Sequence, residues 1–462
     1  MARYRRKKGS VVGKIMGILL LVGTLATAWY VYTAPEFEKI KPQIDTPSNL
    51  YWNRTDPLKI KVRDNEALKG YEIELSDGVN SVILGKGLFK QQRKEEILLL
   101  KYPKSKVLNP KAKKIMVTIK VYDKSMWNML NGNSAQKSIE LDLDNKRPNV
   151  NILSHSRSIN QGGSALVVFQ AEDENLDQLY IEAGGNIFKP QPYKKDGYYA
   201  ALIAWPFTKS TFEAKIVAVD LANNKRVKSI PFYHRNPKYR TSYIKARDKF
   251  IDGKITDLAL SDPEYASISD RLKKLKSINE TMRLNNEDLI YKLSKDVSSD
   301  LLKSWKVKKF YPLKNGQKVA SFGDHRYYYY ETKENVISES YHVGYDLAST
   351  SMADIKVSNA GRVVYAEDNG IYGNMPMIDH GLGLYTLYGH CSKIIVKDGD
   401  KVKTGDIIAK TGKSGLALGD HLHFGILVQG IEVRPVEWFD QSWIRKFIDN
   451  VFKEADKIII DK

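Results

Sequence analysis

The sequence Tyr341-His342-Val343-Gly344-Tyr345-Asp346 is the first of three histidine-containing motifs in the last third of this chain. It is followed by Leu387-Tyr388-Gly389-His390 and by His421-Leu422-His423-Phe424. Two imidazoles and one carboxylate are ligand types that a catalytic zinc site uses, and two further imidazoles remain for chemistry beside the metal. The pattern therefore predicts a metal site with reactive groups next to it.

The spacing of these residues places them on shared faces. Alternate side chains of a β-strand point to the same side, so His421 and His423 share one face of a strand. His342 and Asp346 share a face of an extended segment and would also be neighbours on a helix. Gly344 between them leaves room for a metal or a closely approaching backbone. Three protein ligands leave one coordination position open, as in catalytic zinc sites, and the single cysteine of the chain excludes a cysteine-type structural site.

Residues from about 319 to 440 resemble the catalytic domain of the lysostaphin/LytM-type zinc metallopeptidases, which cut peptide cross-links in bacterial peptidoglycan. The resemblance rests on His-x-x-x-Asp, Tyr-x-His, a series of glycine turns and His-x-His-Phe. It implies a mainly β, antiparallel catalytic domain that binds one Zn²⁺ ion. It also implies five functional residues, namely the zinc ligands His342, Asp346 and His423 and the catalytic pair His421 and His390.

The resemblance further implies how the site would act. Zinc lowers the pKa of a bound water to about 7. His421 would take the proton as general base, and His390 would donate a hydrogen bond to the oxyanion. The residues alone leave open which of the two imidazoles is the base. The implied substrate is a stem-peptide cross-link of the wall, the D-Ala to meso-diaminopimelate bond.

A non-catalytic or autoinhibited regulator of other wall hydrolases is the alternative, because some relatives have lost their ligands. Every ligand position that the resemblance requires is filled in this chain, which favours the enzyme. In some relatives a side chain from a preceding segment occupies the open zinc position, and this sequence does not identify such a residue.

Other residues of this region have plainer interpretations. We expect His380, which precedes two turn glycines, to be structural, and His325 to line the groove. Cys391 stands where the family commonly has leucine, so we expect the thiol to pack as a hydrophobe. The tyrosines 327–330 would place two rings on each face of a strand, with half in the core and half in a substrate groove.

The amino terminus indicates where this chemistry takes place. Five basic residues among the first eight precede an apolar run at 15–32. About 18 apolar residues are just enough to cross a bilayer, and the positive charges before them orient the chain outward. We therefore expect a single-pass anchor in the inner membrane, with the catalytic domain in the periplasm. A cleaved signal peptide is the alternative, since Ala26-Thr27-Ala28 resembles a cleavage site.

The charge of the chain bears on its partners. A net charge of +19 at pH 7 could suggest nucleic acid, but the basic residues are spread along the chain without a nucleic-acid motif. We expect no nucleic-acid partner, and attraction to anionic lipid or to wall carboxylates explains the charge better. Peptidoglycan stem peptides and the inner membrane are the expected partners. Proteins of wall growth, shape or division are further candidates.

An internal repeat lies between the anchor and the catalytic domain. Residues 58–64 resemble 165–173, and residues 117–123 resemble 215–220, each an alternating strand that ends at Asp. Short alternating strands separated by turns favour two Ig-like β-sandwiches. A stalk is the expected role of these two domains, and docking a partner or covering the groove is the alternative.

A change to helical periodicity follows the repeat. Ser261-Asp262-Pro263-Glu264 is a capping-box helix start. An apolar stripe that we expect to pack on a neighbouring domain, rather than on a partner protein, follows at Ile268, Leu272, Leu275, Ile278 and Met282. A second stripe is expected to pack back on the protein, with contact to a membrane or a partner as the alternative. It contains Ile444, Phe447, Ile448, Val451 and Phe452.

These observations define a multidomain, mainly β chain. The expected segments are a cytoplasmic basic tail (1–10), a transmembrane helix (11–33), two Ig-like β domains (34–145 and 146–236), a helical linker (237–311), a LytM-type catalytic domain (312–440) and an amphipathic C-terminal helix (441–462).

Overall fold

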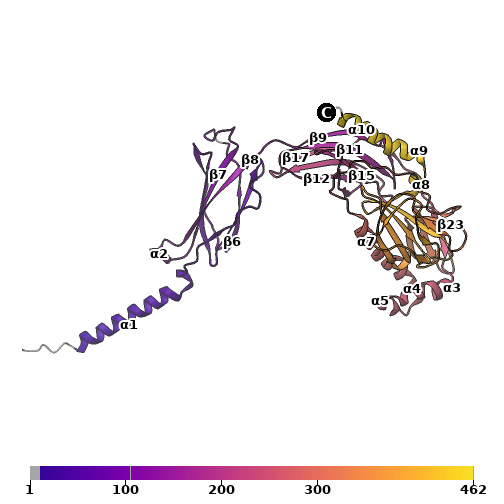
Figure 1. The fold of residues 1–462 in the computed structure, drawn as a ribbon. Helices are drawn as coiled ribbons and strands as arrows, with labels where there is room; N and C mark the ends of the chain where they lie inside the picture. Colours follow the sequence, from indigo (N-terminus) through magenta and orange to yellow (C-terminus); the bar gives the residue numbers. More distant parts are fainter. Residues whose placement is uncertain (1–10, 105, 461–462) are drawn as a thin grey trace, which may run out of the picture. The chain divides into compact units, whose positions relative to one another are not determined.

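The computed structural model describes residues 11–104 and 106–460, so the predicted basic tail lies outside the described residues. The chain is mainly β, with an N-terminal apolar helix. It divides into two compact units, residues 1–147 with 220–224, and residues 148–219 with 225–462. Figure 1 shows the elements of each unit.

The first unit begins with α1 (Val11–Thr33), a helix of 23 residues with no buried side chain. Its mean hydropathy of 2.0 and its length are sufficient to cross a membrane. A helix of this kind fits both the anchor and the signal peptide that the sequence allows.

Two sheets of the first unit enclose one apolar core. Leu58, Ile60 and Val62 are buried while the basic residues between them are not, as the period-2 pattern predicts. One sheet has the order β1 (Gln43–Ile44), β3 (Leu58–Arg63), β6 (Glu95–Leu100). The other has the order β2 (Tyr51–Trp52), β8 (Ser134–Leu143), β7 (Lys114–Asp123), β4 (Leu68–Ser76), β5 (Ser81–Leu88). Two packed sheets are present, and the Ig-like topology stays a prediction.

The second unit begins with three sheets. One has the order β14 (Gln191–Pro192), β15 (Tyr198–Ala204), β11 (Ser164–Glu172), β9 (Asn149–His155). Another has the order β13 (Asn186–Phe188), β12 (Leu176–Ala183), β16 (Ala214–Asp220), β17 (Lys225–Ser229). The third pairs β10 (Ser158–Asn160) with β18 (Tyr233–Arg235). Their buried side chains form one continuous core with the C-terminal part of the chain.

The C-terminal part is built on an eight-stranded sheet. Its order is β20 (Gln317–Ala320), β23 (Tyr345–Ala348), β31 (Leu422–Val428), β27 (Leu384–Gly389), β26 (Asn374–Asp379), β25 (Gly361–Asp368), β29 (Lys401–Val402), with β32 (Ile431–Val433) paired to β31. Beside it lie β24 (Asp354–Lys356), β30 (Ile407–Lys410) and β28 (Lys393–Ile394) in a smaller sheet.

The central strands β27 and β31 are buried along their whole length. Alternate residues face two different cores: Leu384 and Phe424 join the core shared with the strands of 149–204, and Leu387 joins a core shared with helices. Because other elements cover both faces of these strands, the strands are apolar almost throughout. Their packing also holds in place the histidines at their ends.

The helices that cover the second face precede the sheet in the chain. They are α3 (Asp248–Phe250), η2 (Ile251–Ile255), α4 (Thr256–Leu260), α5 (Pro263–Ala266), α6 (Arg271–Lys276), η3 (Ser277–Met282) and α7 (Arg283–Ser294). The predicted stripe packs as expected, since Leu275, Ile278 and Met282 are buried against Met375 and Met377 of β26.

Two details of this helical segment differ from expectation. The helix at Pro263 is capped by Asp262, whose side chain accepts from the Glu264 N–H, and not by Ser261, whose hydroxyl donates to the Leu258 carbonyl. The segment expected to be helical also begins with a strand, β19 (Thr241–Lys245). The sequence Thr-Ser-Tyr-Ile-Lys alternates with the period of a strand, and the helical pattern that follows masks it.

Strand β19 forms a separate three-stranded sheet with β21 (Asp324–Tyr329) and β22 (Val336–His342). It pairs parallel with β21, and β21 pairs antiparallel with β22. The chain ends in α8 (Pro435–Trp438), α9 (Gln441–Ile444), η5 (Arg445–Asp449) and α10 (Asn450–Ile460). The apolar stripe of this tail packs back on the protein as expected, because Ile448, Val451 and Phe452 join the core formed with β9 and β11.

Candidate metal centre and groove

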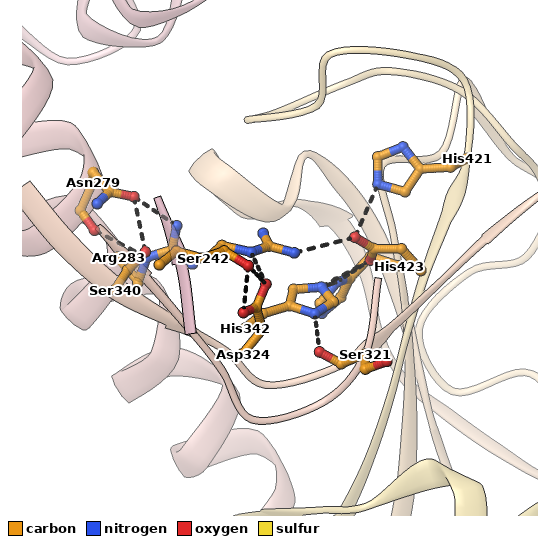
Figure 2. Close-up of polar contacts among 11 residues, drawn as sticks. Ser242, Asn279, Arg283, Ser321, Asp324, Ser340, His342, His421 and His423 are labelled. Carbon is orange, nitrogen blue, oxygen red and sulfur yellow. Dashed lines mark hydrogen bonds and ion pairs between the residues drawn. The ribbon is translucent and has the colours of Figure 1, made fainter. Parts of the chain in front are cut away.

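Three residues from three strands converge at one end of the large sheet. His342 ends β22, Asp346 lies in β23, and His423 lies in β31 directly opposite Asp346 in the antiparallel register. His342 Nε2 and His423 Nδ1 each lie 2.9 Å from Asp346 Oδ1, and these two nitrogens lie 3.0 Å apart. All three residues are buried. Figure 2 shows His342 and His423 facing this common point.

The donor set fits a cation. His342 donates its Nδ1 hydrogen to the Ser321 carbonyl at 2.9 Å, so its Nε2 presents a lone pair. His423 turns Nδ1 toward His342 and Asp346, although its buried Nε2 then has no hydrogen-bond partner among the described residues. At such distances the lone pairs of two imidazoles and a carboxylate need a shared proton or a cation between them. Two nitrogens and one oxygen suit zinc.

The electrostatics of the centre agree with this arrangement. Burial raises the pKa of Asp346, but the neighbouring His342 and His423 outweigh burial and hold that pKa well below its usual value. Burial lowers the pKa of His423 to about 4, although its hydrogen bond to Asp346 opposes the shift. A carboxylate and a neutral imidazole are the ligand forms that a metal requires.

The two remaining imidazoles lie beside this centre. His390 follows β27, and its backbone has a left-handed φ of 64°, which is uncommon for a residue other than glycine and typical of functional sites. His421 immediately precedes β31. The His390 ring lies 4.8 Å from the His421 ring and 5.7 Å from the His423 ring, centroid to centroid, so both members of the His-x-His pair flank it.

One loop determines the tautomer of both imidazoles. His390 Nδ1 donates to the Ser414 carbonyl at 2.9 Å, and His421 Nδ1 donates to the Gly419 carbonyl at 2.8 Å. Both Nε2 atoms are therefore proton acceptors in the neutral rings. Burial holds the pKa of His390 well below its usual value, which keeps this ring neutral. The expected hydrogen bond from His390 to an oxyanion thus requires that His390 first take up a proton.

The helical segment supports the same loop. Lys254 Nζ, from η2, donates to the Lys413 carbonyl at 2.7 Å, one residue before the carbonyl that holds His390. The backbone N–H of His390 donates to the Tyr372 carbonyl at 2.7 Å. Residues 237–311 therefore do more than link domains, because Lys254 holds the loop whose carbonyls orient His390 and His421.

His380, His325 and the cysteine lie apart from the candidate metal centre. His380 is buried between the Ala360 carbonyl and the Thr386 hydroxyl, and burial lowers its pKa to about 4. Cys391 is fully buried in the apolar core. The expectation that His325 lines the groove is wrong: alternation along β21 turns it to the opposite face, where its ring stacks on Tyr341 with centroids 4.2 Å apart.

The centre lies in a groove with a volume of about 1510 Å³. Ten of the residues that line it are arginine or lysine and four are aspartate. Three polar residues on its wall were not predicted from the sequence, namely Ser242, Asp324 and Arg326. Asp324, Arg326 and Tyr328 alternate along a strand, so the sequence predicts that they share one face. It does not predict that this face meets the metal centre.

Residues 340–435 match Peptidase family M23. This part of the chain is an M23 domain. It is 36% identical over 102 residues to stage II sporulation protein Q of Bacillus subtilis, which covers 21% of this chain and 36% of that protein. It is 35% identical over 126 residues to peptidoglycan DD-endopeptidase ShyA of Vibrio cholerae, which covers 27% of this chain and 28% of that protein.

Among solved structures, the M23 domain is similar to the catalytic domain of lysostaphin from Staphylococcus simulans. That alignment has 27% identity and a TM-score of 0.23, and it covers 27% of this chain and 93% of the other. The match spans only about a third of the length of the curated relatives. The curated relatives of the M23 domain include peptidoglycan DD-endopeptidases.

Proposed function

We propose that the chain is a zinc-dependent peptidoglycan endopeptidase that hydrolyses stem-peptide cross-links, with the D-Ala to meso-diaminopimelate bond as substrate. The observation that carries the proposal is the convergence of His342, Asp346 and His423 within 3.0 Å of one another beside two further imidazoles. When bound, zinc supplies a Lewis acid and an activated water.

The chain's own residues would then move the protons. His421, whose Nε2 accepts, takes a proton from the attacking water and returns it to the leaving amine. His390 is held in the same tautomer and lies close enough to share this role. The groove around them accommodates a peptide.

The location of the enzyme is part of the proposal. The α1 helix would anchor the chain in the inner membrane, with the M23 domain in the periplasm. Remodelling of the wall for growth, shape or division would be the biological role. The partners would then be stem peptides and the membrane, and no nucleic acid.

Digestion of purified sacculi by the full chain in mild detergent, loaded with zinc, tests the function. Products are identified by mass spectrometry, and His421→Ala is the control. We expect cross-linked dimers to disappear only with the unmodified protein, and the products to identify the bond. If the zinc-loaded protein releases nothing, the alternative of a regulator of other wall hydrolases takes its place.

A further inference from the structure

One cation beside the metal centre has no role in the function proposed above. Arg326 lies in the middle strand of the sheet β19-β21-β22, with Ser242 and Ser340 as its cross-strand neighbours. Its side chain lines the groove and is 20% exposed. Both cross-strand neighbours have small side chains.

The guanidinium is held along one edge. Arg326 Nε donates to Asp324 Oδ2 at 3.3 Å, and buried Asp324 accepts from the Ser242 hydroxyl at 2.8 Å and 3.0 Å. Figure 2 shows Ser242 and Asp324 together beside His342. Strand β19, which precedes the M23 domain, thus fixes the orientation of a cation inside the groove.

Arg326 forms an ion pair with Asp346 but no hydrogen bond to it. Its Nη2 lies 3.8 Å from Asp346 Oδ2, which is longer than a hydrogen bond. Asp346 Oδ1 already lies 2.9 Å from both His342 Nε2 and His423 Nδ1. Among the described residues, the Nη donors of Arg326 have no acceptor at hydrogen-bond distance, so they can bind a ligand that enters the groove.

The charges around Arg326 favour an anion. With zinc in place, the metal ion and Arg326 carry three positive charges, and Asp324 and Asp346 carry two negative charges. The centre therefore keeps a net positive charge. The basic residues that line the rest of the groove add to this field. Arginine presents paired donors in a plane that matches a carboxylate.

We propose that Arg326 forms a carboxylate subsite next to the scissile bond. This inference rests on the proposed function and narrows its substrate class. The preferred peptide would carry a free carboxylate on the carbon that bears the leaving amine. A diaminopimelate cross-link meets this condition, whereas an amidated cross-link does not.

Binding tests the subsite without relying on turnover. Two synthetic cross-linked stem peptides, identical except for carboxylate or carboxamide on that carbon, are titrated calorimetrically into the zinc-loaded full chain carrying His421→Ala. We expect the carboxylate peptide to bind at least about tenfold more tightly. Adding Arg326→Gln should remove the preference at unchanged zinc content, and Arg326→Lys should keep part of it.

A matched pair of serine variants tests the support of Arg326. Ser242→Ala removes a hydrogen bond to Asp324 and should weaken the preference for the carboxylate. Ser340→Ala, on the other side of Arg326, loses only a contact with Asn279 and should leave the preference unchanged. Equal binding of the two peptides, or a preference that survives Arg326→Gln, would overturn the subsite.

The proposed subsite and the proposed endopeptidase activity can be contradicted independently of each other. A preference that depends on Arg326, in a zinc-loaded protein that cleaves neither peptide, supports the subsite and contradicts the endopeptidase. Cleavage of both peptides at equal rates, unchanged by Arg326→Gln, supports the endopeptidase and contradicts the subsite.

Discussion

The imidazole rings of His390 and His421 lie side by side, with centroids 4.8 Å apart, and each donates its Nδ1 hydrogen to a carbonyl of the same loop. In the neutral rings, this shared support makes both Nε2 atoms the acceptors. A pair of proton acceptors beside a metal centre is the arrangement that hydrolysis of a peptide bond requires. Because the pair is separate from the metal-binding residues, substitutions can remove proton transfer without removing the metal.

Replacing the base and replacing a ligand should have different effects. His421→Ala should keep zinc and lower kcat by about 10²–10⁴-fold, because only proton transfer is lost. His423→Ala should lose the metal, because His423 supplies one of three converging donors. Zinc content by mass spectrometry, measured together with turnover, checks both. Full zinc occupancy in His423→Ala would remove this residue from the ligand set.

Gly344 allows the His423 ring to reach its position. A Cβ atom at residue 344 would overlap that ring. Gly344→Ala should therefore displace a ligand and lower zinc affinity by about 10–100-fold, in the range found for disturbed ligand support. Competition with a chelator measures the affinity. Gly419→Ala is the matched control, since a Cβ there meets nothing within 4 Å, and an equal loss in both variants would contradict the steric explanation.

The helical cover should contribute strongly to stability. Ile290 of α7 is completely buried in the core that the helices share with the large sheet. Ile290→Ala should lower the free energy of unfolding by about 2–5 kcal/mol, through lost burial and the cavity left behind. Leu284 of the same helix is 66% exposed, and Leu284→Ala should change it by no more than about 0.5 kcal/mol. Urea unfolding compares the two, and similar effects would mean that the helix does not pack as described.

A buried carboxyl should make stability depend on pH. Burial raises the pKa of Glu437 from 4.5 to about 7, despite hydrogen bonds from Asn160 and Ser164. Between these pH values the folded chain keeps a proton that the unfolded chain has lost. This carboxyl's contribution to stability therefore falls as pH rises through the window, by up to about 1.4 kcal/mol per pH unit, and levels off above it.

Glu437→Gln removes this contribution and tests it. The variant's melting temperature should gain on that of the unmodified protein between pH 4.5 and about 7, with a constant difference above. Both proteins are measured with the metal chelated, so that zinc binding does not add its own pH dependence. A difference that does not vary with pH would show that Glu437 ionises as freely as in the unfolded chain.

The sequence predicted a mainly β catalytic domain and two apolar stripes, because strands and helices leave a local periodicity. Leu384, Leu387 and Phe424 follow patterns that a strand buried on two faces must have. It did not predict β19, whose five residues gain their strand partner from β21, about 80 residues later in the chain. His325 shows the same limit: alternation separates it from Arg326, but only the sheet's position decides which of the two faces the groove.

The sequence by itself predicted the chemistry of the site. Each motif is a local pattern, and the resemblance of the motifs to the lysostaphin/LytM-type peptidases grouped His342, Asp346 and His423 before any fold was known. Only the tertiary structure decided what surrounds them. The loop that sets the tautomers of His390 and His421, and the strand that holds Asp324 and Arg326 beside the centre, are brought there by pairing and packing between distant segments. Such contacts depend on register and on burial across the whole unit, which no local pattern encodes.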